Sequence, residues 1–204
     1  MAEKTTINES EKMYENPGEF DEEDEVTLMF PNEDNKTVFF SKFVLTRSSR
    51  VFKAMFQHDL KEKKDKNVNI EDIKVDDFIA FLKWSDPMVS KPPTAENVLK
   101  VVEIAEKYQN ESMINQCRNI MGLDIREAKP ERIIAILLVA AQYNYTEVVE
   151  EGVERMKANY RIREFFDDAQ FEKLPGEIKY RILSKRVSQE YSHMNAGFTN
   201  NLNI

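Results

Sequence analysis

Residues 41–56 read SKFVLTRSSRVFKAMF, and their pattern decides the fold. Phe52, Met55 and Phe56 follow the i, i+3, i+4 spacing that places side chains on one face of a helix. The two serines at 48–49 stand where a helix cap is expected, because a serine hydroxyl accepts a hydrogen bond from a free backbone N–H of the first turn. We therefore predict a short helix that starts after these serines and buries its apolar face.

The segments on either side of this stretch have the pattern of β-strands. Residues 26–30 and 37–40 are rich in β-branched and aromatic side chains, and the sequence NEDN at 32–35 between them favours a turn. These runs predict a β-hairpin. After the helix, Val68 and Ile70 alternate with polar residues and predict a short strand that closes onto the hairpin.

Helical periodicity dominates the rest of the chain. The aspartates at 76–77 are predicted to start a helix that contains Phe78, and Thr94 is placed to cap the next one. Asn110 restarts the chain in a further helix, which runs through Met113, Ile114, Cys117 and Met121.

Beyond Gly122 the pattern is helical only. Residues 133–141 are nearly all apolar and predict a helix buried on all sides, residues 148–160 are amphipathic, and Pro175 opens a last helix. Strands early and helices late, without repeated βα units, indicate an α+β domain followed by an all-α extension. We expect an acidic disordered tail at 1–24, the α+β domain at 25–122, the helical extension at 123–187 and a second disordered tail at 188–204.

The charge balance and the hydropathy exclude two classes of partner. The chain has 37 acidic and 29 basic side chains, and its net charge of −8 repels a nucleic-acid backbone. A span of about 20 apolar residues, which a membrane helix needs, is absent, and the N-terminus lacks the apolar centre of a signal peptide. We therefore expect an intracellular protein, in the cytoplasm or the nucleus, that binds neither nucleic acid nor membranes.

The sequence offers little for catalysis or cofactor binding. Its five glycines are not clustered, so they form no phosphate-binding loop, and one cysteine with two distant histidines cannot complete a zinc site. Cys117 follows Met113 and Ile114 at the i+4 and i+3 positions, which predicts core packing, while His58 and His193 are predicted to lie at a helix end and in a tail. We therefore expect no catalytic residue, no metal and no cofactor, and a function other than that of an enzyme.

A family resemblance adds to this reading. Its motifs occur in a fixed order: EVTL at 25–28, SKFVL at 41–45, SRVFKAMF at 49–56, VNIEDI at 68–73, and further runs at 78–84 and 96–109. In order and spacing they resemble a BTB (POZ) domain that ends near Cys117. The helical remainder, with its runs at 137–143 and 171–177, resembles the BACK-like extension that follows many BTB domains.

The resemblance implies self-association. BTB domains commonly form dimers in which an acidic and a basic side chain meet at the interface, and Glu25 and Lys42 occupy those positions. The partner is then a second copy or another BTB protein, giving a homodimer or a heterodimer. Ser41 and Ser48 stand where the family usually has histidine and arginine, and we expect them to alter this interface rather than the fold.

The resemblance also implies a cullin scaffold as partner. Many BTB adaptors of ubiquitin ligases bind a cullin through a hydrophobic residue two positions before a glutamate, which Leu60 and Glu62 match, while Phe56 holds the base of that loop. The predicted function is that of a non-catalytic adaptor subunit of a cullin-RING ubiquitin ligase. The alternative is a BTB oligomerisation module that does not bind a cullin.

Overall fold

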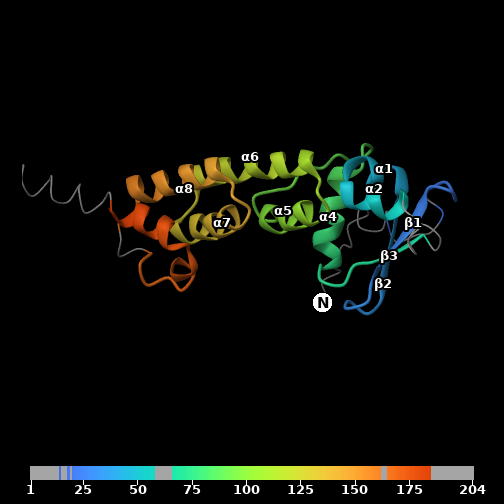
Figure 1. Cartoon of the computed structure of the whole chain (residues 1–204), viewed down its shortest axis with the longest axis horizontal. Coiled ribbons are helices and arrows are strands. Elements are labelled where there is room, and N and C mark those ends of the chain that lie inside the picture. The colour runs from blue at the N-terminus through green and yellow to red at the C-terminus, as the bar shows by residue number, and fades with distance from the viewer. Residues whose placement is uncertain (1–13, 15–17, 19, 58–65, 162–164, 185–204) are drawn as a thin grey trace, which may run out of the picture. The chain divides into compact units, whose positions relative to one another are not determined.

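The computed structural model describes residues 14, 18, 20–57, 66–161 and 165–184, which belong to two compact units (Figure 1). The first unit ends at Cys117 and the second begins at Arg118. In the described residues, the first unit combines three strands with helices and the second is helical, so the predicted α+β class is confirmed. Within these ranges, every helix is too short or too polar to span a bilayer.

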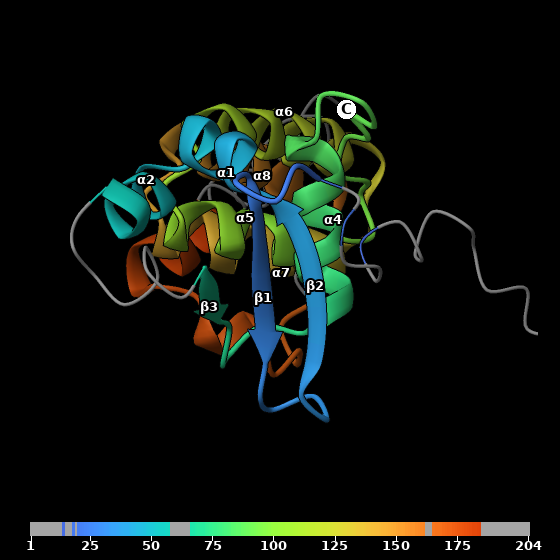
Figure 2. The same ribbon diagram turned by 90° about the vertical axis from the view of Figure 1, so that its right-hand side faces the viewer.

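A mixed sheet forms one side of the first unit. β1 (Glu25–Phe30) lies between β2 (Lys36–Ser41), its antiparallel partner, and β3 (Asn67–Asn69), which runs parallel to it (Figure 2). Every second residue of β1 is buried, so the sheet presents one apolar face to the core. Asp34 and Asn35 in the hairpin turn have φ of 54° and 53°, a conformation that these residue types tolerate. The predicted hairpin and third strand are confirmed.

Two short helices follow the hairpin, α1 (Lys42–Ser48) and α2 (Arg50–Gln57). The helix predicted after the serines is α2, and the chain is already helical before them, in α1. Of the two candidate caps, Ser49 is the one used, because its hydroxyl accepts the N–H of Phe52 at 3.1 Å. The hydroxyl of Ser48 donates instead to the Val44 carbonyl within α1, at 2.8 Å.

α4 (Val75–Ser85) and α5 (Val98–Lys107) complete the core of the first unit. α4 begins just before the predicted aspartates, which lie in its first turn. The prediction that Thr94 caps α5 is wrong, because a turn at residues 95–97 intervenes and Asn97 precedes the first helical residue. An aromatic cluster fills the space between sheet and helices; its members are Phe30, Phe52, Phe56, Phe78, Phe81 and Tyr108.

The described helices after α5 are longer on average. α6 (Glu111–Glu127) contains the boundary between the units and is followed by α7 (Pro130–Gln142) and α8 (Thr146–Asn159). The helix predicted to restart at Asn110 is confirmed, and the side-chain oxygen of Asn110 caps it by accepting the N–H of Met113 at 3.1 Å. The helix predicted through Met121 is confirmed and continues past Gly122, since glycine costs a helix only about 1 kcal/mol and the next turn buries Ile125.

The second unit is held together by close helix packing. A Cβ atom at Gly152 of α8 would lie 2.8 Å from Cδ2 of Leu137 in α7, so the absent side chain permits the close approach of these two helices. Residues 133–141 of α7 are all buried or half-buried, as predicted. The 3₁₀ turn η3 (Phe171–Lys173) leads into a final helix at 176–184, which confirms the helix predicted after Pro175.

Part of the segment expected to be a disordered tail contacts the first unit. Tyr14 is 1% exposed, its hydroxyl donates to Oδ2 of Asp86 at 3.2 Å, and its ring lies edge-on to Phe40 at 5.4 Å. The ring of Phe20 also lies near Phe40, at 5.7 Å. Two aromatic side chains therefore contact β2 from a segment whose composition is otherwise polar and acidic.

Candidate protein-interaction site

The predicted cullin-docking residues begin at the end of α2. Phe56 lies in the last turn, is 8% exposed, and stacks on Phe52 with ring centroids 6.4 Å apart. Leu60 and Glu62 lie outside the described residues, so the structure does not place them relative to Phe56. Phe56 thus fixes the end of α2 in the core directly before the segment at 58–65.

The predicted dimer-interface residues, Glu25 and Lys42, occupy neighbouring positions at the end of the hairpin. Both are half-buried, and each bonds to backbone of the segment before β1. The carboxylate of Glu25 accepts the N–H of Gly18 at 2.7 Å, and the ammonium group of Lys42 donates to the Glu23 carbonyl at 2.9 Å. Both belong to the described part of the chain, and no ion pair joins them there.

Asp24 and Ser41 hold the start of α1, although neither is among the predicted docking or dimer residues. Asp24 accepts the N–H of Phe43 through Oδ1 at 2.7 Å, and the hydroxyl of Ser41 accepts the N–H of Val44 at 3.1 Å. The Ser41 hydroxyl also donates to the other oxygen of Asp24. The serine that stands in the place of the expected histidine is therefore the N-cap of α1.

An exposed aromatic ring marks the outer face of α1. Phe43 is 63% exposed although it is a large apolar residue, and it lines a hollow of about 570 Å³ with Lys42, Thr46 and the acidic run at 21–24. A single exposed apolar side chain is ordinary, but here it adjoins a concentration of carboxylates. This face of α1 therefore offers both apolar contact and charge to a partner.

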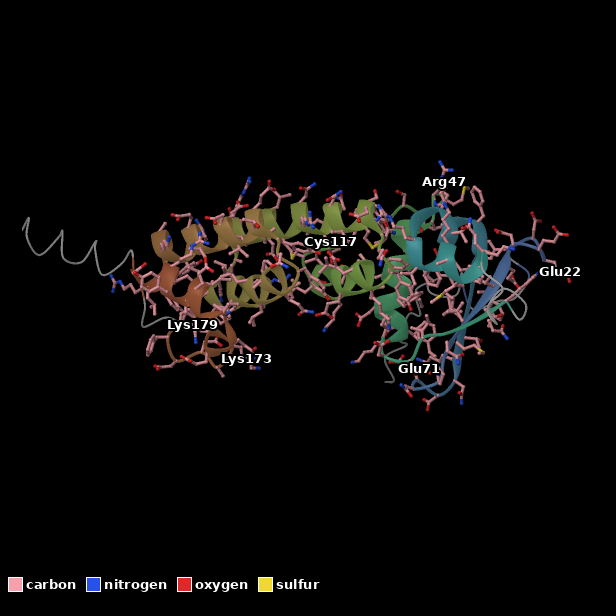
Figure 3. The ribbon with its side chains drawn as sticks, viewed as in Figure 1. Glu22, Arg47, Glu71, Cys117, Lys173 and Lys179 are labelled. Atoms are coloured by element: carbon pink, nitrogen blue, oxygen red, sulfur yellow. The ribbon has the colours of Figure 1, made fainter. Side chains whose placement is uncertain are left out.

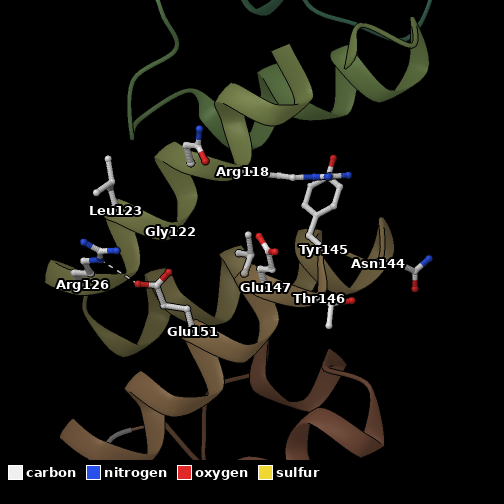
Figure 4. Close-up of a pocket in the computed structure, with 11 residues that line it drawn as sticks. Arg118, Gly122, Leu123, Arg126, Asn144, Tyr145, Thr146, Glu147 and Glu151 are labelled. Carbon is white, nitrogen blue, oxygen red and sulfur yellow. Dashed lines mark hydrogen bonds and ion pairs between the residues drawn. The ribbon is translucent and has the colours of Figure 1, made fainter. Parts of the chain in front are cut away.

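The second unit contains its own hollow, of about 590 Å³, between α6 and the start of α8 (Figure 4). The Arg118 guanidinium lies over the Tyr145 ring, 4.2 Å from its centroid, and the Arg126 Nε bonds Oε1 of Glu151 at 3.0 Å. Both arginines thus have partners within this unit. Leu123, at 60% exposure, is the apolar side chain that the hollow presents.

The cysteine is buried and both histidines lie outside the described residues. Cys117 is fully buried, which confirms its predicted core role, and burial raises the pKa of its thiol to about 12. His58 and His193 lie outside the described residues. Across the described ranges, no three His, Cys, Asp or Glu side chains are grouped so that they could hold a metal ion.

Comparisons with known proteins agree with this fold. The family model of the BTB/POZ domain matches residues 19–122, about half of the chain. The chain is 25% identical over 154 residues to BTB and MATH domain-containing protein 38 of Caenorhabditis elegans, covering 74% of this chain and 38% of that protein. It is 26% identical over 148 residues to human Kelch-like protein 6, covering 70% of this chain and 22% of that protein.

A plant protein gives a shorter match. A BTB/POZ domain-containing protein of Arabidopsis thaliana is 29% identical over 87 residues, which are 43% of this chain and 27% of that protein. The chain therefore spans well under two thirds of the length of these curated relatives. Its sheet and the helices through α6 form the BTB fold, and a helical region follows. The chain belongs to the BTB/POZ family of protein-interaction domains.

Proposed function

We propose that this chain is an adaptor that docks a cullin scaffold through Phe56, Leu60 and Glu62 and so serves a ubiquitin ligase. The burial of Phe56 is the observation that carries the proposal, because it anchors the chain at the base of the segment that contains the other two residues. Lys53, Ala54 and Gln57 are exposed along α2, which leaves this helix accessible beside the segment.

Docking is a physical interaction without a covalent step. Leu60 acts as the apolar anchor and Glu62 as a hydrogen-bonding or charged group, while Phe56 keeps the base of the segment in place. The residues that flank them, at 61 and 63–66, are charged or strongly polar and match a hydrated rim around an apolar contact. The helical region after residue 122 resembles a BACK extension, and we assign it a supporting role.

Replacing Leu60 with aspartate is expected to weaken cullin binding at least tenfold, or about 1.4 kcal/mol, since a charge takes the place of the apolar anchor. The measurement is a titration of the purified full chain against the N-terminal domain of a cullin, with Glu62→Ala as a second variant. We expect the wild type to bind with a Kd in the micromolar range or tighter.

The matched control for this experiment is Asn67→Asp. Asn67 is exposed at the start of β3, two positions after the segment, and the substitution adds the same charge. It should leave the Kd within about twofold of the wild-type value. The adaptor proposal is abandoned if the wild type does not bind the cullin domain, or if Asn67→Asp weakens binding as much as Leu60→Asp.

Exposed Phe43 favours a second function, self-association through the face that contains Glu25 and Lys42. This face combines an apolar ring with carboxylates at 21–24 and the basic Lys42, so one copy offers groups of both signs to another. Without cullin binding, the chain would act as a homodimeric or heterodimeric BTB module.

Replacing Lys42 with alanine tests the interface role. Among the described residues of one chain, Lys42 bonds only the exposed backbone carbonyl of Glu23, so the loss should cost the folded monomer about 1 kcal/mol or less. If Lys42 is buried against an acidic partner in a dimer, the loss rises to about 3 to 5 kcal/mol. Sedimentation equilibrium should then show a dissociation constant more than a hundredfold higher, whereas Lys36→Ala, at the exposed other end of β2, should leave it unchanged.

A further inference from the structure

A groove of about 750 Å³ lies on the first unit, formed by α1, α2, the end of α4 and the start of α6. Its size is within the range of sites that bind small ligands and short peptide segments. The apolar part of its lining includes Phe43, half-buried Trp84 and exposed Pro87. Phe56, the cullin-docking residue that the structure describes, does not line this groove.

Positive charge collects in this groove although the chain as a whole has a net charge of −8. Arg47, Arg50 and Lys53 line it, against a single carboxylate, that of Glu111. Figure 3 shows Arg47 projecting away from its helix. Arg47 and Lys53 form no ion pair with any described residue, and Arg50 approaches Glu111 only at 4.0 Å with both side chains mostly exposed. An exposed pair at that distance leaves most of the local positive charge uncompensated.

A buried donor without an acceptor lies in the wall of the same groove. Asn110 is 1% exposed, and its Nδ2 atom has no hydrogen-bond partner among the residues that the structure describes. The orientation of this amide is fixed, because Oδ1 must accept the N–H of Met113 at the start of α6 and a flipped amide would lose that bond. A buried amide N–H₂ without an acceptor costs about 1 to 3 kcal/mol, so an incoming acceptor would be favoured there.

We propose that this groove binds a short acidic segment of a partner protein in extended conformation. The carboxylates of the segment face Arg47 and Lys53, an apolar side chain contacts Trp84 and Pro87, and a backbone carbonyl accepts the free N–H of Asn110. A peptide supplies all three groups at once, since each residue carries a carbonyl and side chains alternate along an extended strand.

A protein segment fits this groove better than a nucleic acid does. A phosphate backbone carries about one charge per 1.7 Å of duplex and would extend past the groove, where Phe43 adjoins the carboxylates at 21–24. A short segment with a few carboxylates matches the extent of the basic lining.

The chain provides its own probe for this site, because Trp84, which lines the groove, is its single tryptophan. The full chain is titrated with an end-capped peptide of sequence ELDELD, with its amide analogue QLNQLN, and with a short DNA single strand of equal charge. We expect ELDELD to change the Trp84 fluorescence saturably, with a Kd on the order of 100 µM or tighter at low salt, and to bind more weakly as salt rises. QLNQLN and the DNA strand should bind at least tenfold more weakly.

Two variants locate the binding site. Arg47→Glu combined with Lys53→Glu reverses two exposed charges and should weaken ELDELD binding at least tenfold, while Lys36→Glu, at the far end of β2, should leave it unchanged. Asn110→Ser keeps a helix cap but removes the free amide, and should weaken binding about threefold to tenfold. Leu60→Asp should have no effect on the peptide, so this proposal and the cullin proposal can fail independently.

Several outcomes would overturn the proposal. Equal affinities for ELDELD and QLNQLN would show that the carboxylates do not contribute to binding. Tighter binding of the DNA strand than of ELDELD would show that the groove is a general site for polyanions. Full affinity in the Arg47→Glu, Lys53→Glu variant places the peptide elsewhere. Displacement of the peptide on self-association, measured by sedimentation at rising protein concentration, would instead assign the groove to a second copy of the chain.

Discussion

Replacing Phe78 with alanine is expected to lower the free energy of unfolding of the first unit by about 3 to 5 kcal/mol. The side chain is fully buried in α4, and its ring lies 5.7 Å from that of Phe30, 5.4 Å from Phe81 and 5.5 Å from Tyr108. The substitution removes contacts to three rings and leaves a cavity that the sheet and α5 cannot close without moving. Urea unfolding followed by Trp84 fluorescence measures this loss, since Trp84 lies on the same helix.

Met88→Ala is the control for this measurement. Met88 is 89% exposed and should change the unfolding free energy by no more than about 0.5 kcal/mol. A loss below about 1 kcal/mol in Phe78→Ala would show that the aromatic cluster is not the centre of this core. Because the cluster also includes Phe56, a confirmed effect would link core stability to the end of α2.

Local sequence patterns predicted the parts of the fold that depend on short-range spacing. The hairpin follows from two β-rich runs around a turn whose Asp34 and Asn35 tolerate positive φ, and the α2 face follows from the spacing of Phe52 and Phe56. The spacing of Cys117 from apolar residues three and four positions earlier in the sequence predicts a place in the core, and Cys117 is fully buried. In each case the residues that decide the structure are within a few positions of one another.

Contacts between distant segments could not be predicted in the same way. Asp24 accepts the N–H of Phe43 at the start of α1 because the pairing of Glu25 with Ser41 brings the start of β1 beside the start of the helix, and no local pattern contains that register. Tyr14 lies in a polar segment, but its contact with Asp86 spans 72 positions in sequence. The unbonded Nδ2 of Asn110 likewise becomes visible only when its surroundings are known, although the start of a helix at Asn110 was predicted.

Neither local patterns nor the contacts within one chain settle the roles of the predicted site residues. Glu25 and Lys42 were paired through a family resemblance, and within one chain each bonds to backbone instead of to the other. That arrangement leaves their role in a dimer as a prediction, because a partner chain would have to supply the opposite charge. Leu60 and Glu62 remain predictions from sequence alone, with buried Phe56 as the described residue that supports them.

Raising the pH from about 9 to about 12 is expected to destabilise the fold through Cys117. Burial raises the pKa of this thiol from its ordinary value of 9.0 to about 12, so in this range the unfolded chain loses a proton that the native chain retains. The contribution of the protonated thiol to the free energy of unfolding is therefore fully present below about pH 9. It is lost as the pH rises, and the loss reaches about 4 kcal/mol near pH 12. Burial, with a smaller effect of the Asp72 carboxylate, also raises the pKa of Tyr108, which acts in the same direction.

Cys117→Ala separates the thiol from the other groups that titrate at alkaline pH. The variant loses a small amount of packing at every pH, but its unfolding free energy should fall less steeply between pH 9 and 11 than that of the wild type. Urea unfolding at several pH values measures both slopes, and identical slopes would mean that the thiol titrates alike in the folded and unfolded chain. A steeper wild-type slope, together with slow reaction of the native thiol with a disulfide reagent, would establish that Cys117 is a packing residue whose proton is held by the core.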